Sequence, residues 1–193
     1  MSSVDTQHLR NVAFVSHSGA GKTSMVEALL FASGGTSRLG KVDDGNTASD
    51  YEAEEVKRAG SIQTSVLPCT WKDHKLNLLD TPGYPDFVGE VVSGLRATDA
   101  VVLVVTAQSG VEVGTEDAWR LCEEAGVPRL VLINKMDREN ADFQRTLENI
   151  QDVFGRKCVA IQVPVGAEQS FQGVLSLLEP AGEASSDVVA DVE

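Results

Sequence analysis

Residues 11–32, which read NVAFVSHSGAGKTSMVEALLFA, decide the fold that we expect. Residues 11–15 form a short apolar run, and a cluster of Ser and Gly residues follows it. In residues 23–32 the apolar side chains recur at the spacing of a helix. The stretch therefore predicts a strand, a glycine-rich loop and a helix in immediate succession.

The rest of the chain continues this alternation of strands and helices. Ala100–Thr106 reads AVVLVVT, a β-branched run expected of a strand that is buried on both faces of a parallel sheet. Further strands are expected at 62–70, 75–79, 130–133 and 158–163, and further helices at 85–97, 115–125 and 142–154. This order predicts an α/β fold, a three-layer sandwich with a mostly parallel sheet, of the P-loop NTPase type.

The length and composition bound the domain organisation. With 193 residues, 42% of them hydrophobic, the chain is long enough for one core but hardly for two. We expect one domain at 9–178, an N-terminal tail at 1–8, and a disordered acidic tail at 179–193 with five acidic residues and no basic one. Residues 33–60, rich in Gly, Ser, Asp and Glu, predict a long surface loop or partly helical segment, and such loops are usually functional or mobile.

The charge and the cysteines exclude several classes of protein. A formal charge of −13 argues against a sequence-independent nucleic-acid binder, so we expect no DNA partner. Cys69, Cys122 and Cys158 are odd in number and far apart, which argues against a disulfide framework or a structural metal. No apolar stretch is long enough to span a membrane and the N-terminus is polar, so we expect a soluble, cytoplasmic protein with no membrane partner.

The glycine-rich loop carries a phosphate-binding pattern. Residues 16–23, SHSGAGKT, match G-x-x-x-x-G-K-S/T except that Ser16 replaces the first Gly. Lys22 can neutralise β- and γ-phosphate charge at a helix N-terminus, and the Thr23 hydroxyl can bind Mg²⁺. The expected nucleotide-binding residues of this loop are Ser18, Gly19, Ala20, Gly21, Lys22, Thr23 and Ser24. The alternative is an ordinary glycine-rich turn, but the position between a strand and a helix favours the phosphate loop.

A second motif follows the strand LNLL. Residues 80–83 read DTPG, which puts the Asp80 carboxylate at the carboxyl end of a strand, where ligands bind in open α/β sheets. We expect Asp80 to bind Mg²⁺ through water and the Gly83 backbone N–H to sense the γ-phosphate. By itself the tetrapeptide could also be a Pro-Gly turn after an edge strand.

A third motif, NKMD at residues 134–137, follows the strand LVLI. The Asp137 carboxylate can accept hydrogen bonds from the guanine ring N1–H and the exocyclic amino group, and adenine offers neither donor. Asn134 is expected at the other edge of the base, and the stem of Lys135 along its ring. NKxD alone could be a polar loop before a helix. Three motifs in this order, each at the end of a strand, predict a site for GTP and GDP.

The chain resembles translational GTPases, and among them the elongation factor G family with its elongation-factor-G-like paralogues, over about residues 9–178. The stretches that carry the resemblance are RNVAFVSHSGAGKTSMVEALLF, GKVDDGNTASDYEAEEVKRAGSIQTS, DTPGYPDFVGEV and NKMDRENADF. The second stretch matches the first switch of the family, in which Ser61 takes the place of the Mg²⁺-binding Thr. The resemblance therefore implies a metal set of Thr23, Ser61 and Asp80, and a monomeric GTP-hydrolysing switch that acts on the ribosome.

Three departures from the family concern hydrolysis. Tyr84 stands where the family usually has a His that positions water, although the elongation-factor-G-like paralogues commonly carry Tyr there. Ser18 and Gly60 align with a bulky apolar pair, and Gly19 aligns with a frequent Asp. The resemblance thus implies slow catalysis by Lys22, Gly83 and Tyr84.

Two other functions remain as alternatives. The first is a GTP-binding regulatory module with negligible hydrolysis. The second is an ATP-using P-loop enzyme, which the NKMD motif disfavours. The Ser-Ala loop that completes the guanine pocket of the family is not found, so we expect a fragment of a longer protein, because a missing strand and helix would expose apolar surface.

Overall fold

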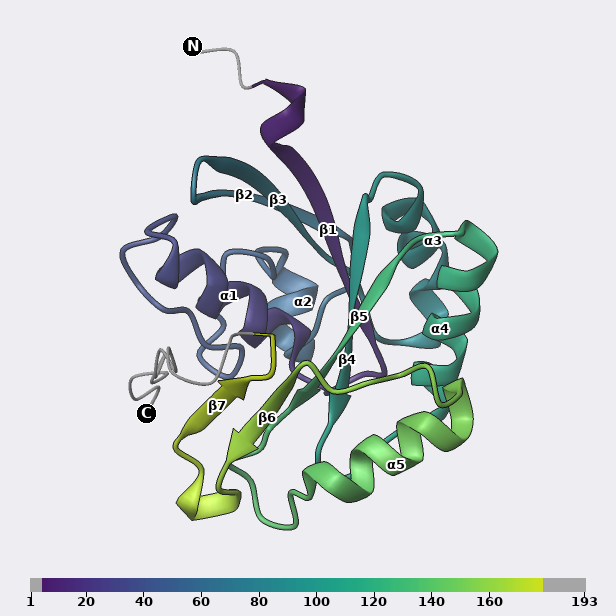
Figure 1. Cartoon of the computed structure of the whole chain (residues 1–193). Helices are drawn as coiled ribbons and strands as arrows, with labels where there is room; N and C mark the ends of the chain where they lie inside the picture. Colours follow the sequence, from purple (N-terminus) through teal and green to yellow (C-terminus); the bar gives the residue numbers. More distant parts are fainter. Residues whose placement is uncertain (1–4, 179–193) are drawn as a thin grey trace. The chain divides into compact units, whose positions relative to one another are not determined.

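The structure is a computed structural model that describes residues 5–178 (Figure 1). The chain divides into two compact units. The first comprises Met1–Val104 and Val113–Leu132, and the second comprises Val105–Glu112 and Ile133–Glu193. The acidic tail expected at 179–193 lies outside the described residues.

A five-stranded sheet has the order β2-β3-β1-β4-β5. Its strands are β1 (Leu9–Ser16), β2 (Ser65–Trp71), β3 (His74–Asp80), β4 (Ala100–Thr106) and β5 (Arg129–Asn134). Strand β1 runs parallel to both β3 and β4, and β2 pairs antiparallel with β3 in a hairpin. The expected α/β class and mostly parallel sheet are therefore confirmed.

The helices of the first unit alternate with these strands. They are the 3₁₀ turn η1 (Thr6–His8), α1 (Lys22–Ala32), α2 (Ala53–Arg58), the 3₁₀ turn η2 (Pro85–Phe87), α3 (Val88–Arg96) and α4 (Val113–Ala125). The helix expected at 85–97 is confirmed, and its first turn is a 3₁₀ turn. Pro85 begins this turn, where its fixed φ and missing backbone N–H are tolerated. Residues 33–60 are a loop apart from the short α2, as expected.

The core of the first unit joins α1 to the sheet. Val26 and Leu30 of α1 pack in one buried cluster with Phe14 of β1, Leu78 of β3 and Val104 of β4. The β-branched run of β4 is buried over most of its length, as its sequence predicts. This packing holds the carboxyl ends of β1 and β3 beside the first turn of α1.

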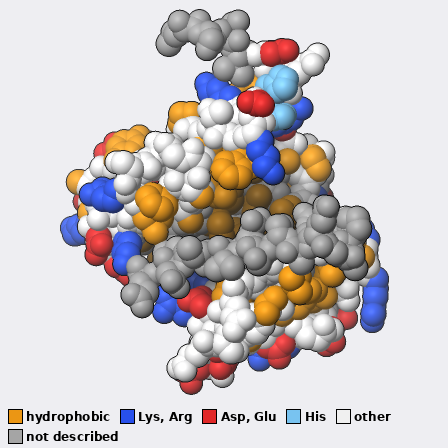
Figure 2. Space-filling model, turned by 60° about the vertical axis from the view of Figure 1, so that its left-hand side comes forward, with side chains coloured by type: hydrophobic (Ala, Val, Ile, Leu, Met, Phe, Trp, Pro, Cys, Tyr) orange, Lys and Arg blue, Asp and Glu red, His pale blue; other side chains and the backbone are white. Residues whose placement is uncertain are grey.

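The N-terminal turn η1 packs on the sheet through a pair of histidines. The ring centroids of His8 and His74 lie 4.8 Å apart, and Figure 2 shows adjoining histidine side chains in pale blue. The His74 ring also approaches the Lys72 carbonyl at 2.9 Å through Nδ1. Residues 6–8, expected in an N-terminal tail, therefore have a defined contact with β3.

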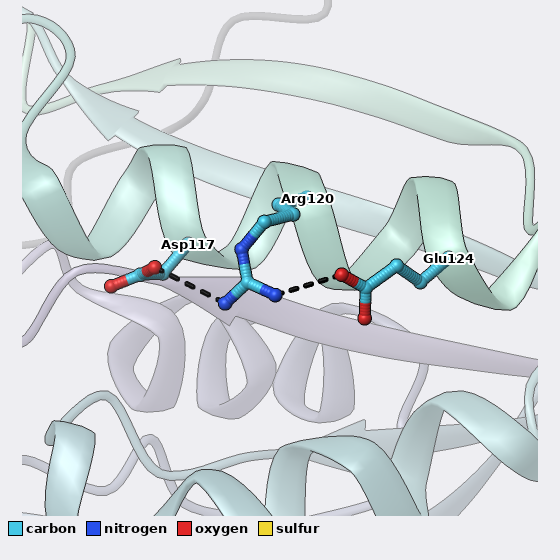
Figure 3. A network of polar contacts seen from close by, with 3 residues as sticks. All are labelled: Asp117, Arg120 and Glu124. Atoms are coloured by element: carbon cyan, nitrogen blue, oxygen red, sulfur yellow. Dashed lines mark hydrogen bonds and ion pairs between the residues drawn. The ribbon is translucent and has the colours of Figure 1, made fainter.

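Helix α4 shows how a helix of this unit divides into two faces. Its buried residues include Ala118, Trp119 and Cys122. On the exposed face the Arg120 guanidinium donates to Asp117 at 3.3 Å and to Glu124 at 2.8 Å (Figure 3). Exposed pairs of this kind contribute little to stability, so the buried face positions the helix.

The second unit contains α5 (Phe143–Phe154), β6 (Gln162–Val165), the 3₁₀ turn η3 (Glu168–Ser170) and β7 (Gly173–Ser176). Asp142 caps α5, because its side chain accepts the Arg145 backbone N–H at 3.0 Å. Among the described residues, 5–178, no helix is both long and apolar enough to cross a membrane.

The strand expected at 158–163 is wrong in its bounds and in its pairing. Strand β6 begins only at Gln162, and it pairs antiparallel with β7 in a separate two-stranded sheet. Pro164 cannot donate to a strand ladder, so it suits the edge of a hairpin better than a central parallel strand. Strand β7 itself was not expected from the sequence.

Candidate nucleotide site

The loop between β1 and α1 has the backbone that a phosphate site requires. Gly19 and Gly21 have φ values of 77° and 96°, in the left-handed region that favours glycine. Gly21 is the N-cap of the 11-residue helix α1, and no side chain caps that helix end. The first N–H groups of α1 are therefore available to bind an anion.

Lys22 lies buried in this loop. Its Nζ donates a hydrogen bond to Ser16 Oγ at 2.9 Å, so the residue that replaces the first Gly of the pattern is its partner. Burial lowers the pKa of Lys22, and the nearby carboxylates of Asp80 and Asp50 oppose that effect. A buried ammonium group of this kind gains a strong partner when a phosphate binds beside it.

The three residues expected to hold the metal lie together. Thr23 Oγ1 donates to Asp80 Oδ2 at 2.8 Å and lies 3.3 Å from Ser61 Oγ. Asp80 is 0% exposed, and among the described residues its Oδ1 atom has no hydrogen-bond partner. Two hydroxyls and a carboxylate are oxygen ligands of the kind Mg²⁺ takes in phosphate sites, where it keeps several waters. These residues therefore fit a Mg²⁺ ion.

Burial also shifts the pKa of the Asp80 carboxyl group. It raises the pKa of the carboxyl group from 3.8 to about 6, against the hydrogen bond from Thr23 and the charge of Lys22. A carboxylate this buried is stabilised by any cation that binds its free oxygen.

The DTPG segment closes tightly over the phosphate loop. A Cβ atom on Gly83 would lie 2.6 Å from Lys22 Nζ and 2.9 Å from Ser18 Cα. Glycine is therefore required here by close approach, and the backbone of residue 83 lies beside the ammonium group of Lys22.

Tyr84 lies at the edge of this arrangement. Its side chain is 48% exposed, and its Cε2 atom lies 3.6 Å from the position of a Cβ on Gly60. Two of the departures from the family therefore lie side by side, because a bulky residue at 60 would contact the Tyr84 ring.

Asp50 is a site residue that the sequence did not single out. It is 4% exposed, and burial raises its pKa against the opposing effects of the neighbouring Ser61 hydroxyl and of the charge of Lys22. Its charge influences both Lys22 and Asp80, which places it beside them. The only signal in the sequence was its place in residues 40–65, the switch-like segment that matches the first switch of the family, where acidic residues are frequent.

Two further buried carboxylates hold the switch-like segment. Glu27 of α1 is 2% exposed and accepts the backbone N–H groups of Gly40, at 3.2 Å, and Ala48. Glu55 of α2 accepts the N–H groups of Ile62 at 2.9 Å and Gln63 at 3.1 Å. The long loop is therefore tied to α1 and α2 by side chains that sequence patterns assign to helix surfaces.

The NKMD motif lies in the second unit. Asn134 ends β5, and its carbonyl accepts the Ala107 backbone N–H at 2.9 Å. Lys135 has a left-handed φ of 61°, and Met136 is buried. Asp137 is exposed, with its Oδ2 atom 3.6 Å from Nε of the exposed Arg138. One loop thus carries Asn134, Lys135 and Asp137, with Met136 as its apolar anchor.

Residues 7–186 match the elongation factor Tu GTP binding domain family. The chain belongs to this family. It is 38% identical over 179 residues to elongation factor G from Granulibacter bethesdensis (strain ATCC BAA-1260 / CGDNIH1), covering 93% of the chain and 26% of that relative. A solved crystal structure of a protein from Thermus thermophilus is similar, with a TM-score of 0.82 and 39% identity. That match covers 86% of this chain and 25% of the other.

These matches confirm the expected resemblance and the P-loop GTPase fold. The chain is thus a member of the elongation factor Tu GTP binding domain family that is similar to elongation factor G, and it spans about a quarter of the length of the relatives that it matches.

Proposed function

We propose that this domain binds GTP with Mg²⁺, hydrolyses it slowly to GDP and phosphate, and acts as the switch of a factor that works on the ribosome. The observation that carries the proposal is the contact of Thr23, Ser61 and Asp80 beneath the phosphate loop. This contact joins α1, the switch-like segment and the end of β3 through the oxygen atoms that a Mg²⁺–triphosphate requires.

Each residue has a role in this proposal. The Lys22 ammonium binds the β- and γ-phosphates, and the Gly83 N–H donates to the γ-phosphate. Thr23, Ser61 and Asp80 would hold Mg²⁺, and the ion would neutralise phosphate charge. The remaining phosphate-loop residues Ser18, Gly19, Ala20, Gly21 and Ser24 bind phosphate oxygens, and Asn134, Lys135 and Asp137 bind guanine.

We also assign Asp50 to the metal site. Its carboxylate is buried beside Ser61, and its charge would help to hold the ion. Asp50 and Ser61 lie in the same switch-like segment.

Hydrolysis is expected to be slow because of Tyr84. A phenol lacks the basic ring nitrogen with which an imidazole can accept a hydrogen bond from the attacking water. The ring is also half exposed beside Gly60, so nothing bulky confines it. These features favour, as a second candidate, a GTP-binding regulatory module with negligible hydrolysis.

Tyr84→His distinguishes the two candidates. An imidazole at this position should orient the attacking water and raise single-turnover hydrolysis by at least about tenfold, with unchanged affinity for GDP. Tyr84→Phe is the matched control, since it removes the hydroxyl and keeps the ring. If the His variant hydrolyses GTP at the wild-type rate, residue 84 does not occupy the water-positioning site.

Nucleotide binding is tested by calorimetric titration with GTP, GDP and ATP in the presence of Mg²⁺. We expect GTP and GDP to bind and ATP not to bind, because adenine cannot donate to the Asp137 carboxylate. Asp137→Ala should lose GDP binding, and Asp152→Ala, an exposed change on α5, serves as its control. Equal binding of ATP and GTP would contradict the guanine assignment.

The ribosome, a cytoplasmic location and a monomeric state complete the proposal. They rest on the family relationship, since translation factors act on ribosomes in the cytoplasm. We expect the chain to sediment with ribosomes in the presence of a GTP analogue and not in the presence of GDP. This result would support the ribosome as the partner. Equal sedimentation in both states would argue against a nucleotide-controlled interaction.

A further inference from the structure

A single residue of the second unit bonds to both sides of Asp137. The Glu168 backbone N–H donates to the Met136 carbonyl at 2.8 Å. The Glu168 side chain accepts the Asn140 backbone N–H at 2.7 Å through Oε1. The loop of residues 134–140, which we call the NKMD loop, is therefore held one residue before Asp137 and three residues after it.

The turn that presents Glu168 has a demanding backbone. Glu168 has a φ of 52°, which is uncommon for a residue with a side chain. Gly166 has a φ of 80°, and a Cβ atom on it would collide with the Ser170 carbonyl. Such conformations persist only where the surrounding contacts hold them in place. The 166–171 turn is thus a specific structure.

The NKMD loop also contains residues in the left-handed region. Lys135 and Asn140 have φ values of 61° and 65°. A loop of this kind depends on ties from outside itself. The Asp137 side chain is exposed, and its contact with Arg138 is an exposed 3.6 Å pair, which is weak. The direction of the Asp137 carboxylate therefore depends on the backbone to either side of it.

Apolar packing joins the turn to the same loop. Met136 and Ala141 form a buried cluster with Ala107, and Ala167 and Phe171 of the turn pack against it. The turn thus contacts the NKMD loop through a small core as well as through the two hydrogen bonds of Glu168. Contacts of both kinds restrict the loop more than either would alone.

We propose that Glu168 is a positioning residue for guanine recognition, which holds the NKMD loop so that the Asp137 carboxylate meets the base. The proposal rests on the proposed function, in which Asp137 accepts from guanine. Glu168 itself touches no nucleotide in this account. Its effect should appear in the discrimination between bases, because that discrimination depends on the direction of one carboxylate.

The test compares GDP with inosine diphosphate, whose base lacks the exocyclic amino group. In the wild type, Asp137 should accept two hydrogen bonds from GDP and one from inosine diphosphate, so GDP should bind more tightly. Glu168→Ala should weaken GDP binding about tenfold, a change of about 1.4 kcal/mol, and bring the ratio of the two affinities close to one. Glu168→Gln keeps an acceptor oxygen for the Asn140 N–H and should stay close to the wild-type ratio.

Two controls separate positioning from folding. Gln169→Ala changes an exposed side chain next to Glu168 in the same turn, and it should leave the affinity ratio unchanged. Glu168→Asp, too short to reach Asn140, decides the question if the Ala variant does not fold. Amide hydrogen exchange of Asn140 in nucleotide-free protein should be faster in either variant than in the wild type.

The outcomes are distinct. A wild-type ratio of GDP to inosine diphosphate affinity in Glu168→Ala or Glu168→Asp, or unchanged exchange at Asn140, would overturn the role of Glu168. A wild-type chain that binds neither nucleotide would instead contradict the proposed function.

Discussion

Asp80 combines a functional position with an unfavourable one for stability. It is fully buried, next to a buried ammonium group and a second buried carboxylate. Burying a carboxylate costs free energy unless a cation or hydrogen bonds compensate it. At this position the compensation comes partly from Thr23 and Lys22, and we expect the rest from Mg²⁺.

Asp80→Asn should stabilise the protein in buffer without metal or nucleotide. Burial raises the pKa of the Asp80 carboxyl group from 3.8 to about 6 in the folded state, so the folded state binds this proton more tightly than the unfolded state. The wild type therefore has its full free energy of unfolding only below about pH 4, and part of it is lost as the pH rises to about 6. The loss is about 3 kcal/mol. Asparagine cannot ionise, so the variant avoids the loss at pH 7.5 and still accepts from Thr23.

Urea unfolding in EDTA measures the free energy of unfolding of both proteins at about pH 7.5 and at about pH 4. The variant should be more stable at the higher pH, and the two proteins should be equally stable at the lower pH. Asp43→Asn, an exposed change in the loop between α1 and α2, should have no effect. A less stable Asp80→Asn protein at pH 7.5 would contradict the sign. The same variant should lose Mg²⁺-dependent nucleotide binding, since the amide carries no charge.

At the scale of elements, the switch-like segment is bonded to α1 through one buried carboxylate, that of Glu27. Glu27 lies on α1, the helix that begins with Lys22, and its carboxylate accepts the backbone N–H groups of Gly40 and Ala48. A Cβ atom on Gly40 would lie 2.5 Å from the Glu27 carboxylate, so the loop lies directly against the helix. Displacement of the segment must therefore break these contacts.

Glu27→Ala should expose the segment to trypsin at Arg38 and Lys41. Each hydrogen bond to a charged acceptor contributes about 1.5–3 kcal/mol, so the cleavage rate should rise by at least about tenfold. Glu27→Gln keeps one acceptor oxygen, so its cleavage rate should lie between those of the wild type and Glu27→Ala. In the wild type, residues 38–63 should be cleaved more slowly with a GTP analogue than with GDP.

The measurement is mass spectrometry of timed digests, with the exposed Glu116→Ala on α4 as the surface control. Equal cleavage of Glu27→Ala and the wild type would show that Glu27 does not hold the segment. Equal cleavage with the two nucleotides would contradict the switch function.

At the scale of the whole molecule, Cys122 reports unfolding. Its side chain is fully buried on α4, and burial raises the pKa of the thiol to about 11. A thiol is reactive only as the thiolate, so the folded protein suppresses its reaction through both access and charge. Cys158 is partly exposed and provides an internal reference.

GDP with Mg²⁺ should slow alkylation of Cys122 in mild urea at about pH 8. A ligand at one hundred times its dissociation constant adds about 2.7 kcal/mol to the free energy of unfolding, which corresponds to about a hundredfold slower labelling through global unfolding. ADP should have no effect. Site-resolved mass spectrometry follows each thiol, and equal protection by ADP would argue against a guanine-specific site.

Local patterns were sufficient for much of this protein. The phosphate loop, the strand AVVLVVT and the order of strands and helices follow from side-chain periodicity and from glycines at left-handed positions, which act over a few residues. Thr23 and Asp80 were singled out by their motifs and Ser61 by the family resemblance. In the structure the three side chains lie in contact, and their role in binding Mg²⁺ remains a prediction. Asp137 and its neighbours were recognised by their motif, and their roles in binding remain predictions.

Only the tertiary structure decided which acidic residues are buried. Asp50, Glu27, Glu55 and Glu168 look like solvated surface residues in the sequence, and the fold gives three of them buried positions and all of them structural partners or charged neighbours. The pairing of β6 with β7 was likewise decided by chain segments that meet across a turn. Such contacts depend on which residues the folded chain brings together, and no periodicity along the sequence encodes them.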